Sequence, residues 1–171
     1  TEKAVSQDTH IAGMVWGSYK GVILVVNKWD LVSSNNGLEK ELYIQQVRSR
    51  FQFMPYAPIM FTSALKRQGI DDLLSIVVEV YAERRRRVFA SDLYNAVMDA
   101  IAMHPPPYNQ NKPFKVHSIR QTGVNPMEIT FDVNDTSVLH FSYKRYLESR
   151  IRTALELRHT RAKLVFRRRK K

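Results

Sequence analysis

The feature that most constrains the fold is an apolar run at residues 22–26, which is followed at once by Asn27-Lys28-Trp29-Asp30. An unbroken Val/Ile/Leu run of this length is typical of a parallel strand that is buried on both faces. Open α/β sheets bind their ligands beyond the carboxyl ends of the strands, so the four residues stand where a ligand is expected. The alternative is a polar loop after a core strand, in which Asp30 only begins the next turn.

The side chains of this motif carry groups that can recognise guanine. The Asp30 carboxylate accepts two hydrogen bonds, which matches the N1–H and the exocyclic amine of guanine. The Asn27 amide can face the opposite edge of the base, and the aliphatic stem of Lys28 can lie along the ring. The motif therefore predicts a guanine-binding loop.

A second segment supports this prediction. Residues 58–61 form another short apolar run, and the sequence Thr-Ser-Ala-Leu follows at 62–65. This order resembles the Ser-Ala loop of small GTPases, in which a backbone N–H reaches the guanine carbonyl. The predicted guanine-binding residues are Asn27, Lys28, Asp30, Ser63, Ala64 and Leu65.

The segments around these two strands predict helices. Residues 8–19 and 39–53 fit helices before and between the strands, and apolar residues from Ile70 to Tyr81 recur at spacings of three and one. We expect this last helix to pack on a sheet. Residues 1–83 are thus predicted to form the closing half of a doubly wound P-loop GTPase domain. The expected buried positions of the second helix are Leu42, Val47, Phe51 and Phe53.

The second half predicts a small α+β domain. Ser91 is expected to cap a helix that ends before the prolines at 105–107, because proline lacks an N–H and disfavours helix before it. Strands follow near 114–121 and 127–133. The buried face of the helix is expected to contain Leu93, Ala96, Val97, Ala100 and Ile101, and that of the second strand Ile129, Phe131 and Val133.

A second helix, which Ser142 is expected to cap, and a strand near 162–167 complete the order αββαβ. This order fits a KH-like module at residues 84–171. An RNA-binding KH domain clamps the backbone with a Gly-x-x-Gly loop, but Gly123 is the only glycine in this half. Inward positions of the helix are expected at Tyr146, Leu147, Ile151, Ala154 and Leu155.

Charge is distributed unevenly between the two halves. Residues 1–83 carry 8 Lys+Arg against 9 Asp+Glu, whereas residues 84–171 carry 19 against 7, a net charge of +12. Such an excess predicts a polyanionic partner, and RNA bound through its phosphates is the natural one. The alternative is a solvated basic surface with a basic tail, and no pattern favours a membrane. The candidate RNA-binding residues are Arg84, Arg85, Arg86, Arg87, Arg145, Arg150, Arg152, Arg167, Arg168 and Arg169.

Short sequence stretches along the whole chain resemble the EngA (Der) family, which has two tandem GTPase domains and a terminal KH-like domain. The resemblance covers the last part of the second GTPase domain and the KH-like domain. Ser118–Asn125 and His159-Thr160-Arg161 depart from the bacterial pattern, which would suit an organellar descendant. The matching stretches include Val25–Leu31, Phe51-Gln52-Phe53, Met98-Asp99-Ala100, Val133-Asn134-Asp135 and His140-Phe141-Ser142-Tyr143.

Elements needed for hydrolysis do not occur in this sequence. It contains no Gly-x-x-x-x-Gly-Lys-Ser/Thr, so no catalytic residue is assigned, and it does not begin with Met. We expect a fragment of a larger protein that could hold Mg²⁺ and hydrolyse GTP only with an upstream part. There is no cysteine, and the histidines lack metal-type spacing, so no metal site is predicted.

The resemblance implies a GTPase with GTP or GDP as ligand, acting in assembly of the large ribosomal subunit. The implied partners are ribosomal RNA, the large-subunit precursor particle and ribosomal proteins, in the bacterial cytoplasm or an organelle matrix, mitochondrial before plastid. The alternative is a non-enzymatic RNA-binding scaffold that keeps a degenerate GTPase fold. An Era-like GTPase is disfavoured, because that family's terminal domain carries the Gly-x-x-Gly loop.

Overall fold

A computed structural model describes residues 6–32, 37–106 and 113–169 of the chain. The chain divides into two compact units, residues 1–82 and 83–171, and each is considered by itself. The sequence had placed this boundary between residues 83 and 84.

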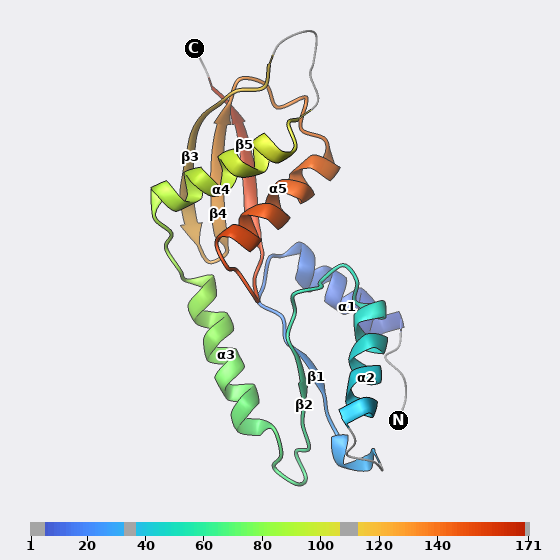
Figure 1. The fold of residues 1–171 in the computed structure, drawn as a ribbon. Helices are drawn as coiled ribbons and strands as arrows, with labels where there is room; N and C mark the ends of the chain where they lie inside the picture. The colour runs from blue at the N-terminus through green and yellow to red at the C-terminus, as the bar shows by residue number, and fades with distance from the viewer. Residues whose placement is uncertain (1–5, 33–36, 107–112, 170–171) are drawn as a thin grey trace. The chain divides into compact units, whose positions relative to one another are not determined.

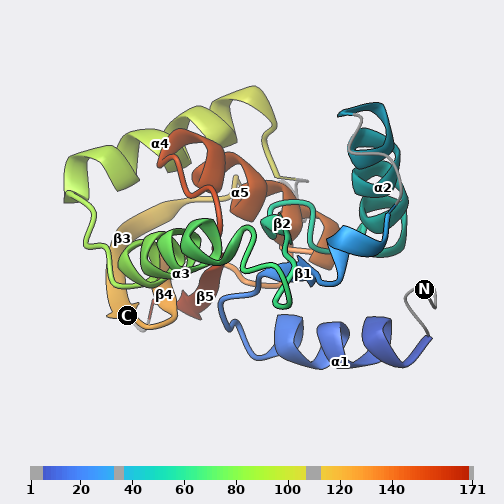
Figure 2. The ribbon, with the colours of Figure 1, turned by 90° about the horizontal axis from the view of Figure 1, so that it is seen from below.

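The first unit contains a parallel two-stranded sheet with helices on both sides. Strands β1 (Leu24–Val26) and β2 (Ile59–Phe61) pair in the register Leu24↔Ile59, Val25↔Met60 and Val26↔Phe61. A 3₁₀ turn at Trp29–Leu31 follows β1. Helices α1 (Ser6–Gly17) and α2 (Gly37–Arg50) lie to one side of the strand pair and α3 (Ile70–Arg84) lies to the other (Figures 1 and 2).

The core of this unit lies between α1, α2 and β1. Its buried apolar residues are Ala12, Phe51, Met54 and Ala57, and Trp16 and Val47 pack against them. Burial of Phe51 was predicted correctly, but Leu42 is 51% exposed and its prediction was wrong. At 3.6 residues per turn, Leu42 stands about 140° around the helix from Val47, which places it on the outer face.

Helix α3 has the predicted extent but not the predicted burial. Of its described side chains only Val80 is buried, whereas Leu74 is 60%, Val78 65% and Tyr81 55% exposed. The prediction that this apolar stripe packs on a sheet was therefore wrong for this structure. Two strands of three residues each present too little surface to cover a helix of 15 residues.

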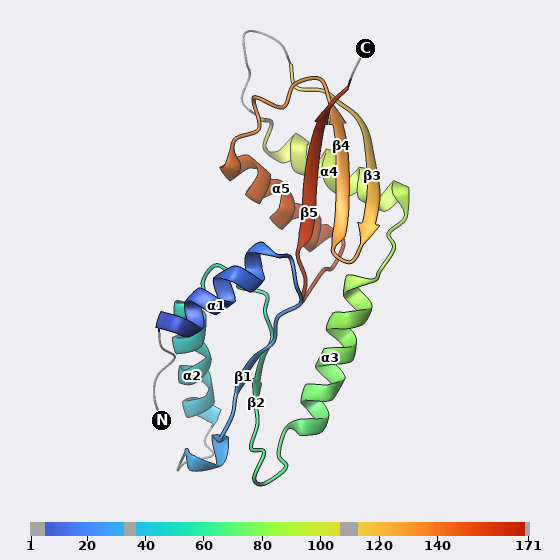
Figure 3. The ribbon, with the colours of Figure 1, turned by 180° about the vertical axis from the view of Figure 1, so that it is seen from behind.

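The second unit has the predicted αββαβ order. Helix α4 (Ala90–Met103) precedes β3 (Val116–Val124) and β4 (Met127–Val133), and α5 (Phe141–Ala154) precedes β5 (Ala162–Arg168). The sheet order is β3-β4-β5, with β3 antiparallel and β5 parallel to the central strand. Both helices cover one face of the sheet, and no helix of this unit covers the other face in the described residues (Figures 1 and 3).

Alternation along β4 accounts for the core of the second unit. Ile129, Phe131 and Val133 are buried as predicted, and Phe131 stacks on Phe166 of β5 with ring centroids 4.6 Å apart. The helices contribute the side chains spaced by three and four residues that their sequences predicted. The buried helix residues are Leu93, Ala96, Val97, Ala100, Tyr143, Leu147 and Ile151.

Both predicted helix caps of this unit were wrong. Helices α4 and α5 begin before the two serines, and Phe89 and His140 occupy the N-cap positions without a side-chain hydrogen bond. Ser91 instead donates to the Asp92 carboxylate, and Ser142 is exposed inside the first turn. Ala154, predicted to face inward, is the last residue of α5 and is exposed.

Candidate guanine site and basic surface

Parallel pairing of β1 and β2 brings the two predicted guanine loops together. The loop after β1 is joined to the loop after β2 by the Trp29 N–H, which donates to the Thr62 carbonyl at 3.0 Å. The Thr62 N–H donates in turn to the Val26 carbonyl at 2.9 Å. The carboxyl ends of both strands therefore lie side by side, as a ligand site in an open α/β sheet requires.

Asn27 links the two loops through its side chain. Its amide oxygen Oδ1 accepts from the Ala64 N–H and from the Thr62 hydroxyl, both at 3.3 Å. These contacts use the acceptor half of the amide and leave its –NH₂ group to donate to a ligand. Asn27 thus both holds the second loop and offers a hydrogen-bond donor.

The Asp30 carboxylate interacts with side chains of the loop that follows β2. The Ser63 hydroxyl donates to the carboxylate and, with a smaller contribution from the charge of Lys66, lowers the pKa of Asp30 below its ordinary value. Ser63 itself is fully buried, and its Oγ accepts from the Lys66 N–H at 3.1 Å. A serine held on both sides in this way fixes the direction of the carboxylate.

Two further members of the predicted set differ in their surroundings. Lys28 has a left-handed backbone, φ 60°, and its side chain is exposed beside the motif. Leu65 is 86% exposed, and only the backbone of its loop adjoins Asn27. The structure therefore brings Asn27, Asp30, Ser63 and Ala64 together and leaves the Leu65 side chain outside this group.

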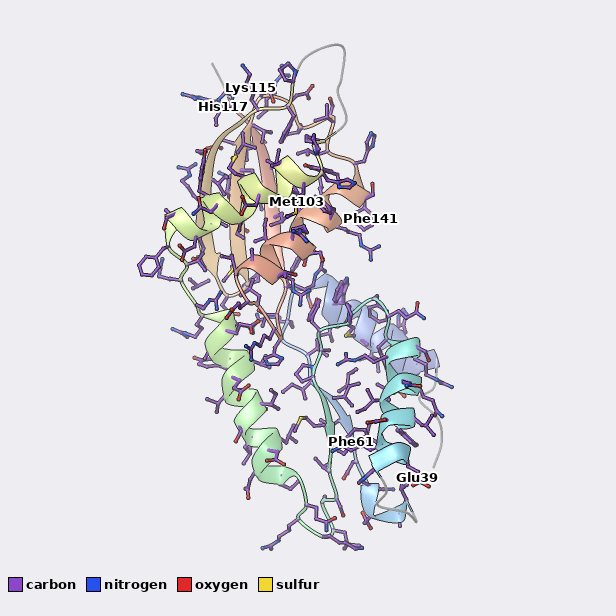
Figure 4. The ribbon with its side chains drawn as sticks, in the orientation of Figure 1. Glu39, Phe61, Met103, Lys115, His117 and Phe141 are labelled. Carbon is purple, nitrogen blue, oxygen red and sulfur yellow. The ribbon has the colours of Figure 1, made fainter. Side chains whose placement is uncertain are left out.

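Trp29 was not singled out from the sequence, although it stands inside the motif. Its ring packs edge-on against Phe61, with centroids 4.4 Å apart, and against Tyr43 at 5.4 Å. Figure 4 labels Phe61 near α2 at this end of the strands. The sequence does contain a signal for this contact, because an aromatic residue stands in the motif and a second aromatic residue, Phe61, ends the neighbouring strand. Trp29 anchors the turn that carries Asp30.

Gly69 shapes the loop after β2 from its far end. Ser63 and Gln68 exchange backbone hydrogen bonds of 3.0 Å, and Gly69 follows with φ +69°. A Cβ atom at this position would lie 2.3 Å from the Phe61 carbonyl oxygen. The close approach to the β2 backbone therefore requires glycine.

Several of the predicted RNA-binding arginines have partners within the second unit. Arg84 donates to the Asn125 side chain, and Arg86 donates to the Leu155 carbonyl. Arg152 donates to the carbonyl oxygens of Leu157 and Thr160. These three guanidinium groups stabilise the domain, which reduces what they can offer to a phosphate.

The remaining candidates are distributed over three places. Arg145 and Arg150 lie on α5, where they contact the Phe141 ring and the Met103 sulfur respectively. Arg85 and Arg87 are exposed in the segment that leads into α4. The last group is at and just beyond the end of β5 and is exposed: Arg167, Arg168 and Arg169.

The open face of the sheet pairs most of its charges internally. Arg120 contacts Asp132 at 2.9 Å, and Lys163 contacts Glu128 at 2.9 Å. A hydrogen bond from Ser118, together with nearby arginines, lowers the pKa of Asp132, and hydrogen bonds from Lys163 and Thr122 lower that of Glu128. This face is therefore a network of paired charges rather than a uniformly basic surface.

Glu83 is an important residue that the sequence did not reveal. Its carboxylate accepts from the backbone N–H groups of Arg158 and His159 at 2.9 and 3.0 Å, and from the Thr160 hydroxyl at 2.6 Å. All these residues belong to the second unit. No local pattern around Glu83 signals this role, because its partners lie 75 or more positions away in the sequence.

Two negative findings apply to the described part of the chain. No cluster of three or more His, Asp or Glu side chains there could hold a metal ion. Likewise, none of the helices in that part combines the length and apolar character that a membrane crossing requires.

The fold and the site define the closing half of a doubly wound P-loop GTPase domain followed by a KH-like domain. Residues 87–167 match the profile of the family described as "KH-domain-like of EngA bacterial GTPase enzymes, C-terminal". The chain is 39% identical over its full length to the GTPase Der of Thermomicrobium roseum and covers 37% of that protein. It is 38% identical to the GTPase Der of Leuconostoc citreum over 96% of the chain, and again covers 37% of the relative.

The chain belongs to the EngA (Der) family and matches the C-terminal portion of its members, as the sequence predicted. It spans a little over a third of the length of these curated relatives. Among solved structures, an Aquifex aeolicus Era variant bound to GDP and aluminium fluoride aligns over 95% of the chain and 60% of that protein. Its TM-score is 0.37 and its identity 16%, which is too low to support an inference about function.

Proposed function

We propose that this chain is the guanine-recognising and RNA-binding portion of a GTPase that acts in assembly of the large ribosomal subunit. In the intact protein, Asn27 and Asp30 select guanine, Ser63 fixes the Asp30 carboxylate, and Lys28 and the Leu65 loop border the base. The upstream part supplies the phosphate loop and Mg²⁺. Hydrolysis of GTP then controls the contacts of the KH-like domain with ribosomal RNA and ribosomal proteins.

The observation that carries the guanine assignment is the pairing of Asp30 with the buried Ser63 hydroxyl beside the Asn27–Ala64 contact. A solvated polar loop would not need a fully buried serine to hold one carboxylate in a fixed direction. The two acceptor oxygens of Asp30 complement the two donors of guanine, whereas adenine offers a different pattern on the same edge.

The test is nucleotide selectivity in the full-length protein. Asp30→Asn should weaken GTP binding about tenfold or more, because an amide donor then faces a guanine donor. The affinity of this variant for xanthosine triphosphate should fall less than its affinity for GTP, or should rise, since the 2-oxo group of xanthine accepts a hydrogen bond from the amide. The matched control is Asp72→Asn, because Asp72 is an exposed acid in the first turn of α3. This substitution should leave the affinities for GTP and for xanthosine triphosphate unchanged.

Titration calorimetry with both nucleotides decides the matter. Equal GTP affinity of Asp30→Asn and wild type would remove Asp30 from the guanine site. Loss of affinity for both nucleotides in equal measure would indicate a folding defect of the loop rather than base recognition.

The RNA half of the proposal rests on charge. The second unit carries the whole positive excess of the chain, and no Gly-x-x-Gly loop is available to clamp a strand. Binding to ribosomal RNA should therefore weaken steeply with salt. The relatives named above are bacterial, which favours the bacterial cytoplasm and lends no support to an organellar location.

The scaffold alternative makes a different prediction for the same protein. A non-enzymatic scaffold would bind ribosomal RNA with equal affinity in the presence of GTP, of GDP and without nucleotide. A nucleotide-controlled factor should show an RNA affinity that depends on which nucleotide is bound.

A further inference from the structure

The N-terminal half of α5 carries an unusual pair of exposed side chains. Phe141, the first residue of the helix, is 74% exposed, and the Arg145 guanidinium carbon lies 5.6 Å from the centre of its ring. An apolar ring gains little from folding when it stays in water, so packing does not account for its position. Figure 4 labels Phe141 at the outer end of α5 and Met103 at the adjoining end of α4.

A second pair of the same kind stands on the neighbouring helix. Met103, the last residue of α4, is 62% exposed, and the Arg150 guanidinium lies against its sulfur. Two guanidinium groups on one helix are thus each placed against an exposed apolar side chain. Of the two pairs, only Phe141 with Arg145 combines an exposed ring with a cation, and single-stranded nucleic acids bind such surfaces with a base on the ring and a phosphate on the cation.

This end of the helical layer is held rigidly. The Tyr143 hydroxyl donates to the His104 carbonyl and the Tyr146 hydroxyl to the Ala100 carbonyl, both at 2.8 Å. Two carbonyl groups at the end of α4 are thereby bonded to α5. A platform fixed in this way loses little conformational freedom when a base stacks on it.

Charge distinguishes this surface from the open face of the sheet. Helix α5 contains one acid, Glu148, whose carboxylate is paired with Arg161 through contacts of 2.7 and 2.8 Å. Beside Phe141, Arg145 therefore acts on an incoming polyanion without an opposing free carboxylate on the same helix. The sheet face, by contrast, presents Glu128 and Asp132 among its cations.

We infer that the outer side of α5 is a base-stacking site for single-stranded RNA, with Phe141 as the stacking ring and Arg145 as its phosphate contact. The inference rests on the proposed RNA binding of residues 84–171 and names where and how the strand lies. It assigns recognition to a stacked ring in a domain without a Gly-x-x-Gly clamp. The site accepts any base, because every base has a π-face.

The experiment uses the 171-residue chain and a fluorescein-labelled oligouridylate, with affinity measured by anisotropy over a series of salt concentrations. Phe141→Leu should weaken binding by at least about fivefold at every salt concentration, since stacking is lost and no charge changes. Phe141→Trp should bind at least as tightly as wild type. Tyr94→Ala is the matched control, because Tyr94 is an exposed aromatic residue on α4, and it should leave the affinity unchanged.

Charge variants and an abasic strand separate the two contributions. Arg145→Gln should reduce the slope of log affinity against log salt by about 0.7, the value for one phosphate of a single strand. Arg120→Gln, on the sheet face, should leave that slope unchanged. For an abasic strand of the same length, Phe141→Leu should bind as wild type does.

Each outcome decides between the proposals. If wild type binds the strand and Phe141→Leu behaves like Tyr94→Ala, the stacking site is wrong while RNA binding by the domain stands. If Arg120→Gln alone lowers the slope, the strand lies on the sheet face instead. If wild type does not bind RNA even at low salt, both the inference and the RNA half of the proposed function are overturned, and an acidic protein partner becomes the occupant to test.

Discussion

The ion pair between Glu148 and Arg161 offers a quantitative test of what stabilises the KH-like domain. Two hydrogen bonds of 2.8 and 2.7 Å join the carboxylate to the guanidinium in a bidentate arrangement, and each side chain is only 13% exposed. Glu148→Gln keeps the shape but turns an amide –NH₂ toward a guanidinium donor. Arg161 then loses both of these hydrogen bonds while its guanidinium stays largely buried.

The expected cost follows from this burial. Removing one partner of a fully buried pair costs about 3–5 kcal/mol, and the residual access to water places Glu148→Gln near the lower end, at about 3 kcal/mol. Lys163→Gln is the matched control, because the ion pair of Lys163 with Glu128 is more accessible to water, with 42% of the Lys163 and 24% of the Glu128 side chain exposed. Breaking that surface pair should cost about 1 kcal/mol or less.

Amide hydrogen exchange along β4 (Met127–Val133) measures the stability of this unit separately. A loss of about 3 kcal/mol makes the slowest amides exchange about a hundredfold faster. Trp16 and Trp29, the two tryptophans of the chain, lie in the first unit, so their fluorescence reports a different unfolding transition. A loss for Glu148→Gln no larger than that for Lys163→Gln would refute the argument from burial.

Three further predictions concern other parts of the chain. Gly69→Ala should destabilise the first unit by about 1–3 kcal/mol in urea unfolding followed by tryptophan fluorescence, because its Cβ would collide with the Phe61 carbonyl; an unchanged midpoint would contradict the close approach. The pKa values of Asp132 and Glu128 are lowered in the folded state, so their stabilisation is complete above the unfolded-state values of about 4 to 4.5 and is lost as pH falls below them. Melting temperatures between about pH 3 and pH 5.5, a range about one unit either side of those values, should show this loss, and Asp132→Asn should show less of it. The isolated 171-residue chain should release no phosphate from GTP, because it lacks the Gly-x-x-x-x-Gly-Lys loop; turnover above background would prove this wrong.

Strand and helix periodicity predicted the buried residues of the KH-like unit well, because the side chains that form its core all come from that unit. The alternation of Ile129, Phe131 and Val133 and the helical spacing of Leu147 and Ile151 are each satisfied by contacts within residues 83–171. The helix caps were not predictable in the same way. Serine favours the cap position by a small free energy, and the packing of the whole helix decides where the first turn starts.

In the first unit the sequence predicted which face of α3 is apolar but not what the face contacts. Periodicity marks Leu74, Val78 and Tyr81 as one stripe, yet their burial depends on a sheet surface that is distant in the sequence. Glu83 shows the same limit in a polar case, since its three partners are all supplied by residues 158–160. Local sequence indicates an element and its preferred face, whereas the partner is determined by tertiary structure.

The proximity of the two candidate guanine loops could be predicted from sequence, because the parallel register of β1 and β2 places them side by side. The hydrogen bonds between the two loops join residues 26–30 to residues 62–64, at and just beyond the ends of β1 and β2. A slip of one residue from the register Val26↔Phe61 would displace one loop by about 3.3 Å and direct its side chains to the opposite face. A shift of that size would break the hydrogen bond of Asn27 to Ala64 and the one that holds Asp30. The apolar run before the motif therefore has a functional consequence: by fixing the register of β1 against β2, it fixes the position of the carboxylate that we propose selects guanine.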